Sequence, residues 1–440
     1  MNDSVYCYRS MTSTIIQSKQ TESAPTVSEL SEEQKIALDL LKSGDNIFLT
    51  GGAGSGKSYV IREFMKDLNP DSLPILASTG AAAVLLGGRT YHSFFGIGIM
   101  EGGLEATVSR ALKDKKLMQR LAKVDGVVID EISMIPGEAL CAAEFLAQAA
   151  RNSILPWGGM RIIAVGDFGQ LPPVTMPGKK RDWCFLHDVW KKTNFIIHQL
   201  KYNQRVKESE YLEVLHQIRS GKVNEAVRNF LNSRVRDHDE DHPGTRLFPR
   251  RDQSDLYNQK KLKEINEDEY VIDTIYLGEE KFIANLKKNT SVAEQLKIKI
   301  GCRVLFLKND AQKRYVNGTR GTVTQFESDF ITVRKDARDK RFQGREIKVE
   351  KMQFSLMDPD GNVKASAIQY PLVLAYATTI HKSQGATLDE LWCDLASLWE
   401  PGQAYVALSR LRDSSGLHIV RWSERSIITD PAVNLFYSQI

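Results

Sequence analysis

The sequence predicts an α/β fold with parallel sheets in more than one domain, interrupted by a small antiparallel β unit. Apolar β-like runs alternate with helical patterns from Asn46 to about His198, which is typical of a parallel sheet covered by helices. A second α/β region begins near Leu200 and resumes from Tyr370 to about Trp422. Between them, short β-like runs separated by Asn-Gly and Asp-Gly-Asn turns indicate an inserted antiparallel barrel.

Composition excludes several classes of protein. A chain of 440 residues is too long for a single core, and its net charge of +4 is too mild to indicate a nucleic-acid partner by itself. The five cysteines are odd in number and never spaced as C-x-x-C, which favours reduced thiols over disulfides or a zinc site. No apolar stretch approaches the roughly 18 residues that span a bilayer. We therefore expect a soluble intracellular protein, cytoplasmic in a bacterium or virus and nuclear or mitochondrial in a eukaryote.

The N-terminal region predicts a disordered tail followed by a capped helix. Residues 1–27 are rich in Ser, Thr and Gln and have no periodic apolar pattern. A targeting peptide is the alternative, but Arg9 and Lys19 are the only basic residues there. Order is expected from Leu30, where Ser31 precedes a helical apolar pattern and Gln34 follows three residues later.

A phosphate loop is the most specific motif. The pattern G-x-x-x-x-G-K-[ST] follows the apolar run 46–50 and precedes a helical pattern from Tyr59, which is the strand-loop-helix context that such a site needs. Its backbone N–H groups and the helix N-terminus suit a nucleotide phosphate. Lys57 is expected to contact the β- and γ-phosphates, and the Ser58 hydroxyl to ligate Mg²⁺. The residues of the loop are Gly51, Gly52, Ala53, Gly54, Ser55, Gly56, Lys57 and Ser58.

The rest of this region supplies a sheet with helices on both faces. Its functional residues are expected at the carboxyl ends of the strands. We expect strands at Ile47–Thr50, Ile75–Ser78, Val127–Ile129, Ile162–Val165 and Phe195–His198. We expect helices at Tyr59–Leu68, Glu105–Lys123 and Gly137–Arg151.

Two further strand ends carry residues suited to nucleotide hydrolysis. Asp130 and Glu131 end an apolar strand, where one carboxylate can hold Mg²⁺ and the other can orient the attacking water. Gln170 follows the next strand and precedes Pro172 and Pro173. Its amide can sense a γ-phosphate, and the rigid prolines can transmit a displacement. An ordinary strand-to-loop turn is the alternative for the Gln170 segment.

The second α/β region contributes donors and arginines. Thr378, Thr379 and His381 belong to a segment dense in hydrogen-bond donors, which suits phosphate oxygens and sugars. Arg205 and Arg410 are distant in sequence from the phosphate loop, and arginines offered across a cleft can make its closure depend on the γ-phosphate. A surface salt bridge is the alternative for either arginine alone.

In order and spacing these blocks resemble the superfamily-1 5′-to-3′ DNA helicases of the Pif-type family, related to the phage Dda and RecD motors. The match runs from Leu30 to about Arg412, and one departure is Gln204-Arg205-Val206, where the family usually carries Phe-Arg-Gln. The resemblance implies two tandem RecA-like domains, with a small wedge insertion in the first and a Src-homology-3-like β-barrel inserted in the second. It implies that Gln34 reads the adenine and that Gln384 joins the γ-phosphate sensors. It also implies that the first domain contacts DNA through Thr79, Gly80, His92 and Ser93.

Domain boundaries follow from these patterns and from the resemblance. The strands expected in the barrel are Arg303–Leu307, Thr319–Phe326, Phe330–Val333 and Glu346–Met352. The expected divisions are a tail over 1–27, the first domain over 28–198 with its wedge at about 95–112, and the second domain over 199–297 and 369–440, with the barrel over 298–368.

Two sets of residues, one aromatic and one apolar, follow the first predicted DNA contacts. Phe94 and Phe95 are candidates to stack on bases, with core packing as the alternative. The glycine-rich stretch after them, with Ile97, Ile99 and Met100, is expected to form the wedge that splits the duplex. The alternatives are an ordinary surface loop there and a separating element in the barrel near Tyr315 to Arg320.

The leading functional hypothesis is an ATP- and Mg²⁺-dependent DNA helicase in replication, recombination or repair. It is expected to move 5′-to-3′ on single-stranded DNA and to unwind forked or tailed duplexes as a monomer. A single-strand-binding protein is a further candidate partner, and no membrane is involved. The alternatives are a RecD-like motor subunit of a recombination complex and a single-strand-binding ATPase clamp without processive unwinding.

Overall fold

The structure of the chain is a computed structural model. It describes residues 30–440 except 80–81, 83–88, 99, 101, 176–177, 179, 238–243, 291, 311, 313, 316, 337–344 and 359–361. The predicted tail over 1–27 therefore lies outside the described residues, as does Gly80.

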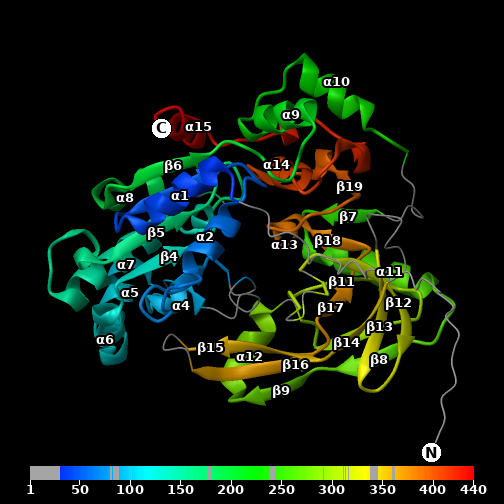
Figure 1. The fold of residues 1–440 in the computed structure, drawn as a ribbon, viewed down its shortest axis with the longest axis horizontal. Helices are drawn as coiled ribbons and strands as arrows, with labels where there is room; N and C mark the ends of the chain where they lie inside the picture. Colours follow the sequence, from blue (N-terminus) through cyan, green and yellow to red (C-terminus); the bar gives the residue numbers. More distant parts are fainter. Residues whose placement is uncertain are drawn as a thin grey trace, which may run out of the picture.

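The first α/β unit is built on a six-stranded parallel sheet with the order β3-β2-β4-β5-β1-β6 (Figure 1). The five strands predicted from the sequence are confirmed to within two residues at each end, and β3 is an addition. The β1 and β4 strands are buried along their whole length, as expected for a parallel sheet covered on both faces. The strands are β1 (Ile47–Gly51), β2 (Ile75–Ala77), β3 (Arg89–Thr90), β4 (Gly126–Ile129), β5 (Arg161–Val165) and β6 (Ile196–Leu200).

Helices cover both faces of this sheet, because side chains alternate along each strand. Ile47 and Leu49 face a core shared with α1 and α2, while Phe48 faces the larger core shared with α5, α6 and α7. Ser31 caps α1 and forms the predicted capping box with Gln34. The helices are α1 (Glu32–Lys42), α2 (Lys57–Met65), α4 (Tyr91–Phe94), α5 (Gly103–Ala111), α6 (Lys115–Lys123), α7 (Gly137–Arg151) and α8 (Asp188–Thr193).

The single helix predicted over Glu105–Lys123 is wrong. The chain forms α5 and α6 with a break between them, and the Asp114 carboxylate accepts hydrogen bonds from the N–H groups of Lys116 and Leu117. An aspartate in this position satisfies the free N–H groups of a helix start, so it begins a second helix instead of continuing the first.

The second α/β unit carries a four-stranded parallel sheet with the order β18-β7-β19-β20. Tyr211 and Phe230 of α9 and α10 pack on it in one core with Leu247 and Ile419. The strands are β7 (Thr245–Phe248), β18 (Ala377–Thr379), β19 (Leu391–Asp394) and β20 (Leu417–Arg421). The helices are α9 (Ser209–Arg219), α10 (Glu225–Ser233), α11 (Arg251–Glu264), α13 (Ile380–Ser383) and α14 (Gln403–Leu408).

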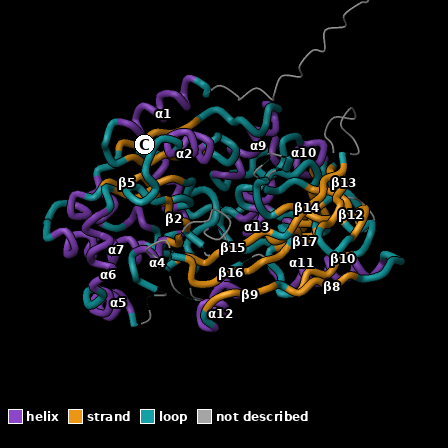
Figure 2. The backbone as a smooth tube through the Cα atoms, turned by 60° about the horizontal axis from the view of Figure 1, so that its bottom comes forward, coloured by secondary structure: helices purple, strands orange, loops and turns teal. Residues whose placement is uncertain are grey.

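An antiparallel β unit is inserted into the second sheet, and the four strands predicted in it are confirmed. It begins earlier than the predicted residue 298, because β8 pairs with β10 and β9 pairs with β16. Its strands lie along the bottom and lower right of Figure 1, and in Figure 2 β12 and β13 lie at one end of the molecule while β15 and β16 reach toward its middle. They are β8 (Tyr270–Asp273), β9 (Ile275–Gly278), β10 (Gln295–Ile298), β11 (Arg303–Phe306), β12 (Arg320–Phe326), β13 (Phe330–Lys335), β14 (Glu346–Glu350), β15 (Met352–Met357), β16 (Val363–Gln369) and β17 (Leu372–Leu374), with helix α12 at Glu280–Asn289.

The last helix, α15 (Pro431–Tyr437), returns to the first unit. Val433 belongs to the large core of the first sheet, and the Phe436 ring lies 5.3 Å from the ring of Phe168. The prediction that assigned all of 369–440 to the second domain is therefore wrong for this helix. A short apolar helix carries no local signal of which core it joins.

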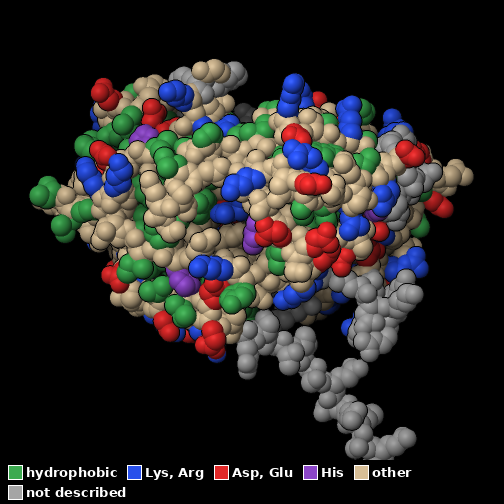
Figure 3. Space-filling model, turned by 90° about the horizontal axis from the view of Figure 1, so that it is seen from above, with side chains coloured by type: hydrophobic (Ala, Val, Ile, Leu, Met, Phe, Trp, Pro, Cys, Tyr) green, Lys and Arg blue, Asp and Glu red, His purple; other side chains and the backbone are tan. Residues whose placement is uncertain are grey.

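The molecular surface carries charges of both signs, in keeping with the modest net charge of the sequence. Acidic and basic side chains are interspersed on the face drawn in Figure 3. In the described part of the chain, no helix is both long enough and apolar enough to cross a bilayer.

Candidate nucleotide and DNA sites

The phosphate loop connects β1 to α2 with an open turn. Gly54 and Gly56 have φ values of 85° and 93°, a backbone region that residues with a Cβ rarely adopt. Lys57 Nζ donates to the carbonyls of Gly51 at 2.7 Å and Gly52 at 3.2 Å. Burial lowers the pKa of Lys57, with Asp167 and Glu131 opposing the shift. The ammonium is thus held inside the loop by neutral carbonyls, which a phosphate can replace.

Gln34 lies against the same loop from the outside. Its Nε2 atom would be 2.4 Å from a Cβ placed on Gly56, so the loop and the Gln34 amide pack without space for a side chain. Gln34 Oε1 also accepts the Ser31 N–H at 3.1 Å. The structure thus brings the predicted adenine reader next to the loop.

The two acids after β4 are partly exposed and make different contacts. Asp130 Oδ1 accepts the N–H of Glu131 at 3.0 Å. Glu131 has left-handed backbone angles, φ 52° and ψ 50°, a conformation that costs a non-glycine residue about 1–3 kcal/mol and that clusters at active sites. Its Oε2 atom is inaccessible and has no hydrogen-bond partner among the described residues. Burial, and secondly Asp130, raise the pKa of Glu131 to about 7.

Arg205 and Arg410 approach the loop from the second unit. Arg410 is fully buried, and its guanidinium donates to Val406 O at 2.7 Å and to Ser409 Oγ at 2.8 Å. Arg205 Nη1 donates to Ser409 O at 2.6 Å. Burial, and secondly the charge of Arg205, lower the pKa of Arg410 to about 9. Two neighbouring guanidinium groups held by neutral oxygens favour an anion between them.

Gln170 and Gln384 meet between the units. Gln384 Nε2 donates to Gln170 Oε1 at 3.4 Å, and Gln170 is buried. The two predicted γ-phosphate sensors are thus in contact, although 214 residues separate them in sequence.

One cavity of about 320 Å³ brings most of these groups together. Its lining includes all the predicted catalytic residues except Gln384, which reaches it through Gln170. Five lining residues were not predicted from the sequence. One of them, Arg412, could have been found, because it stands two positions after the predicted catalytic Arg410. The missed residues are Tyr59, Gln204, Gly385, Thr387 and Arg412.

A tyrosine hydroxyl that the sequence did not indicate also joins the two units at this cavity. Tyr405 of α14 accepts the N–H of Ala53 in the phosphate loop at 2.8 Å. Asn203 Nδ2 donates to the carbonyl of the same residue at 2.9 Å. The loop is therefore held by the second unit as well as by its own strand and helix.

The residues predicted to make the first DNA contact surround helix α4. Thr90 caps this helix by accepting the N–H of Ser93 at 3.1 Å, and His92 and Ser93 are partly exposed. Burial lowers the pKa of His92. Thr79 is also partly exposed, and its hydroxyl accepts the N–H of Ala82 at 3.2 Å.

The predicted stacking of bases on Phe94 and Phe95 is wrong. Both rings have no exposed surface and pack edge to face with centroids 5.1 Å apart. Phe95 also lies 6.1 Å from Trp157, in the large core of the first sheet. Two adjacent aromatic residues can stack on bases or fill a core, and only the tertiary packing distinguishes the two.

The predicted wedge role is contradicted for Ile97 and stays a prediction for the rest of the glycine-rich stretch. Ile97 is fully buried, and Met100 packs against the same core; Ile99 lies outside the described residues. The alternative separating element near Tyr315 is not supported at that residue either, because the Tyr315 ring is buried and stacks on Phe306 at 3.9 Å.

Truncating Phe95 is therefore expected to affect stability and not DNA stacking. Phe95→Ala should lower the free energy of unfolding by about 3–5 kcal/mol, as for a large buried aromatic side chain. Urea denaturation followed by tryptophan fluorescence measures this loss. Phe145→Ala is the matched control, since Phe145 is half exposed on α7. Unchanged stability with weakened binding of single strands would contradict the burial.

The residues predicted to make the second DNA contact lie at the end of β18 and the start of α13. Thr379 is buried and caps this helix by accepting the N–H of Lys382 at 3.2 Å, so its role is structural and the predicted contact with DNA has no support for it. Thr378 is partly exposed. His381 has an exposed side chain and lies 3.6 Å from Glu400, which in turn lies 3.8 Å from Arg181 of the first unit.

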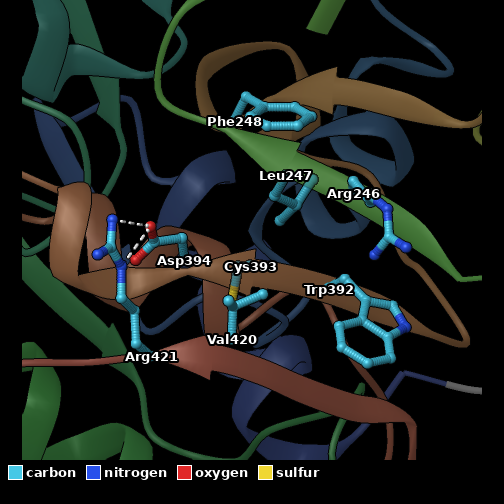
Figure 4. A pocket seen from close by; sticks show the side chains of 8 residues that line it. All are labelled: Arg246, Leu247, Phe248, Trp392, Cys393, Asp394, Val420 and Arg421. Atoms are coloured by element: carbon cyan, nitrogen blue, oxygen red, sulfur yellow. Dashed lines mark hydrogen bonds and ion pairs between the residues drawn. The ribbon is translucent and has the colours of Figure 1, made fainter. Parts of the chain in front are cut away.

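A second hollow, of about 400 Å³, lies over the second sheet. Figure 4 shows Arg246, Trp392 and the ion-paired Asp394 and Arg421 around it. None of the site residues predicted from the sequence lines it.

Comparison with known proteins identifies the family. Residues 29–229 match the PIF1-like helicase family, and residues 281–326 match the 2B domain of DNA helicase Pif1. The ATP-dependent DNA helicase Pif1 of Bdellovibrio bacteriovorus is 64% identical over 411 residues, which cover 93% of this chain and 92% of the relative. The chain belongs to the PIF1-like helicase family. It is therefore an ATP-dependent DNA helicase with the fold that the sequence predicted.

Solved structures of the family agree with this fold. Bacteroides sp. Pif1 in complex with ADP-AlF4 has a TM-score of 0.81 at 30% identity, covering 93% of this chain and 97% of that one. Unliganded Bacteroides Pif1 has a TM-score of 0.79, with 93% and 96% covered at 30% identity. Bacteroides Pif1 bound to single-stranded DNA has a TM-score of 0.63, also at 30% identity and with 93% and 97% covered. The present structure therefore resembles the unliganded arrangement more than the DNA-bound one.

Proposed function

We propose that this family member moves 5′-to-3′ on single-stranded DNA by opening and closing the cleft between its two α/β units. One observation carries the proposal. Lys57, Glu131 and Gln170 of the first unit line the same cavity as Arg205 and Arg410 of the second. A γ-phosphate there would contact both units, so its binding and loss would change how they contact each other.

We assign roles in the cavity by chemistry. Lys57 would hold the phosphates, Glu131 would orient and deprotonate the attacking water, and Arg205 and Arg410 would stabilise the transition-state charge. Gln170 and Gln384 would sense the γ-phosphate, and Gln34 would read the adenine. Glu131 lines the cavity, and its Oε2 atom has no partner among the described residues, so the carboxylate is not committed to a structural hydrogen bond.

The residues present also fit Mg²⁺. Ser58 and Asp130 line the cavity and offer a hydroxyl and a carboxylate oxygen, the ligand types that Mg²⁺ takes alongside nucleotide phosphates. Bound there, the ion would neutralise phosphate charge. The protein's part is to hold Asp130 in place, which the N–H of Glu131 does.

On the DNA side we propose two grips. Thr79, His92 and Ser93 form the first, and Thr378 and His381 the second, each on a different α/β unit. Gly80 remains a candidate for the first grip and lies outside the described residues. A relative motion of the units would move one grip along the strand relative to the other.

We propose that the motor acts as a monomer in the cytoplasm, on single-stranded and forked or tailed duplex DNA, and that a single-strand-binding protein is a partner. A related structure is titled as two coordinating Pif1 helicases at forked DNA, so a pair at a fork is the competing arrangement. Unwinding of tailed duplexes of each polarity, in DNA and RNA, tests the proposal. Unwinding from a 3′ tail would overturn the polarity, and failure of the purified chain to unwind alone would favour a RecD-like subunit.

Lys57→Ala tests the phosphate loop. We expect ATP turnover to fall at least about 100-fold, because a lysine clamp on the phosphates supplies much of the electrostatic stabilisation. Binding of a labelled single strand should persist, since the proposed grips lie elsewhere. Lys66→Ala, in the exposed pair with Glu63, is the control. Turnover close to the wild-type value would refute the role of Lys57.

A further inference from the structure

A buried ion pair joins the two α/β units beside the nucleotide cavity. Asp167 follows β5 and its side chain has no exposed surface, while Arg219 ends α9 in the second unit. Arg219 Nη2 lies 2.7 Å from Asp167 Oδ1, and Arg219 Nε lies 3.2 Å from Asp167 Oδ2. Such bidentate contacts fix geometry as well as charge. Burial alone would raise the pKa of Asp167, but the Arg219 charge and hydrogen bonds outweigh burial and lower it.

The C-terminal helix supplies a third member. The Tyr437 hydroxyl of α15 donates to Asp167 Oδ1 at 3.1 Å and accepts the N–H of Phe168 at 3.0 Å. The Arg219 guanidinium lies 4.2 Å from the centre of the Tyr437 ring. We call Asp167, Arg219 and Tyr437 the Asp167 clasp. Its members come from the first unit, the second unit and the helix that returns between them.

Close backbone contacts hold the same loop from both sides. A Cβ on Gly169 would lie 2.7 Å from Arg219 Cγ, and a Cβ on Gly402 would lie 2.2 Å from the carbonyl oxygen of Gln170. The loop that ends in Gln170 therefore fits between α9 and the start of α14, with no space for larger residues at these two glycines.

The clasp leads directly to Gln170. The Gln170 N–H donates to Asp167 O at 2.9 Å, and Gln170 Nε2 lies 3.5 Å from Asp167 Oδ2. The other end of the amide accepts from Gln384. Because an ionised Asp167 can only accept hydrogen bonds, it directs the NH₂ end of Gln170 toward itself and leaves the oxygen facing Gln384.

We propose that Arg219 and Tyr437 are positioning residues for ATP hydrolysis, which act through Asp167 to hold the Gln170 amide in the cavity. The C-terminal helix is then part of the ATPase machinery as well as of the core. This inference rests on the γ-phosphate role proposed for Gln170 and extends it to residues that do not line the cavity.

Conservative variants test the clasp without emptying the core. Tyr437→Phe keeps the ring under Arg219 and removes only the hydroxyl, and Arg219→Lys keeps the charge and removes the bidentate contact. Each should lower the kcat of DNA-stimulated ATP hydrolysis about tenfold, the scale of one hydrogen bond to a charged group, while the KM for ATP changes less than about twofold. Tyr202→Phe and Arg228→Lys are matched controls on exposed residues. An unchanged kcat in both clasp variants overturns the proposal, as does a raised KM with kcat intact.

A double-mutant cycle separates this inference from the proposed role of Gln170. If the clasp acts through Gln170, Tyr437→Phe has no further effect on kcat in a Gln170→Ala background. If the losses in kcat of the two single variants add in the double variant, the clasp does not act through Gln170, and the proposal is overturned. If Gln170→Ala alone leaves kcat unchanged, the proposed role of Gln170 fails, and the inference fails with it. If Gln170→Ala lowers kcat and neither clasp variant does, only the inference fails.

Discussion

Arg410→Ala is expected to lower the kcat of DNA-stimulated ATP hydrolysis about 10³-fold or more, the range for an arginine that stabilises a phosphoryl-transfer transition state. The structure supports this size of effect. The guanidinium is fully buried at the cavity, donates to neutral oxygens within the described part of the chain, and has its pKa lowered to about 9 by burial and then by Arg205. An incoming phosphate would place a negative charge beside both arginines.

Arg410→Ala should affect ATP turnover much more than nucleotide binding. Affinity for ATP should change far less than kcat, because a group from the second unit acts mainly once the cleft has closed on the transition state. Arg205→Ala should show the same split. Arg421→Ala is the control, since that arginine forms an exposed ion pair with Asp394. Wild-type kinetics in Arg410→Ala would reduce its role to packing.

Glu131→Gln is expected to slow hydrolysis about 10²- to 10⁴-fold, the usual contribution of a general base, with ATP affinity nearly unchanged. The amide keeps the shape of the carboxylate but cannot take a proton from water. Glu131 lines the cavity, and its Oε2 atom has no hydrogen-bond partner within the described structure, so the substitution removes no structural bond of that atom.

Single-turnover hydrolysis and equilibrium binding of labelled ATP measure the two quantities for this variant. Glu138→Gln, an exposed glutamate in the first turn of α7, controls for the loss of one negative charge. If Glu131→Gln lost affinity for ATP while its turnover was unchanged, the proposed roles of Asp130 and Glu131 would have to be exchanged.

Much of the fold could be predicted because its signals are local. Strands such as Val127–Ile129 are uninterrupted apolar runs, and the helix from Glu32 carries its own cap at Ser31. The phosphate loop and the two acids after β4 were found in the same way, since each combines a strand with the residues directly after it. The start of α6 at Asp114 was missed, although its capping residue was visible in the sequence.

Other features depend on partners far away in the chain. The aromatic rings of Phe94 and Phe95 are equally suited to a base and to a core, and only the packing with Trp157 and its neighbours decides for the core. The inserted β unit begins near Tyr270 because β8 and β9 pair with strands that follow much later.

The sequence by itself indicated the chemistry proposed for this protein. The nucleotide loop, the two acids and Gln170 were recognisable from their immediate neighbours, whereas Gln384 was assigned from the family resemblance and the two arginines from their place in the second region. The tertiary structure alone decided which of these meet in one cavity and that Phe94 and Phe95 belong to the core. It also brought Tyr437 and Arg219 to Asp167, across 270 and 52 residues of sequence. Such contacts arise from the packing of whole elements, and no local pattern of residues encodes them.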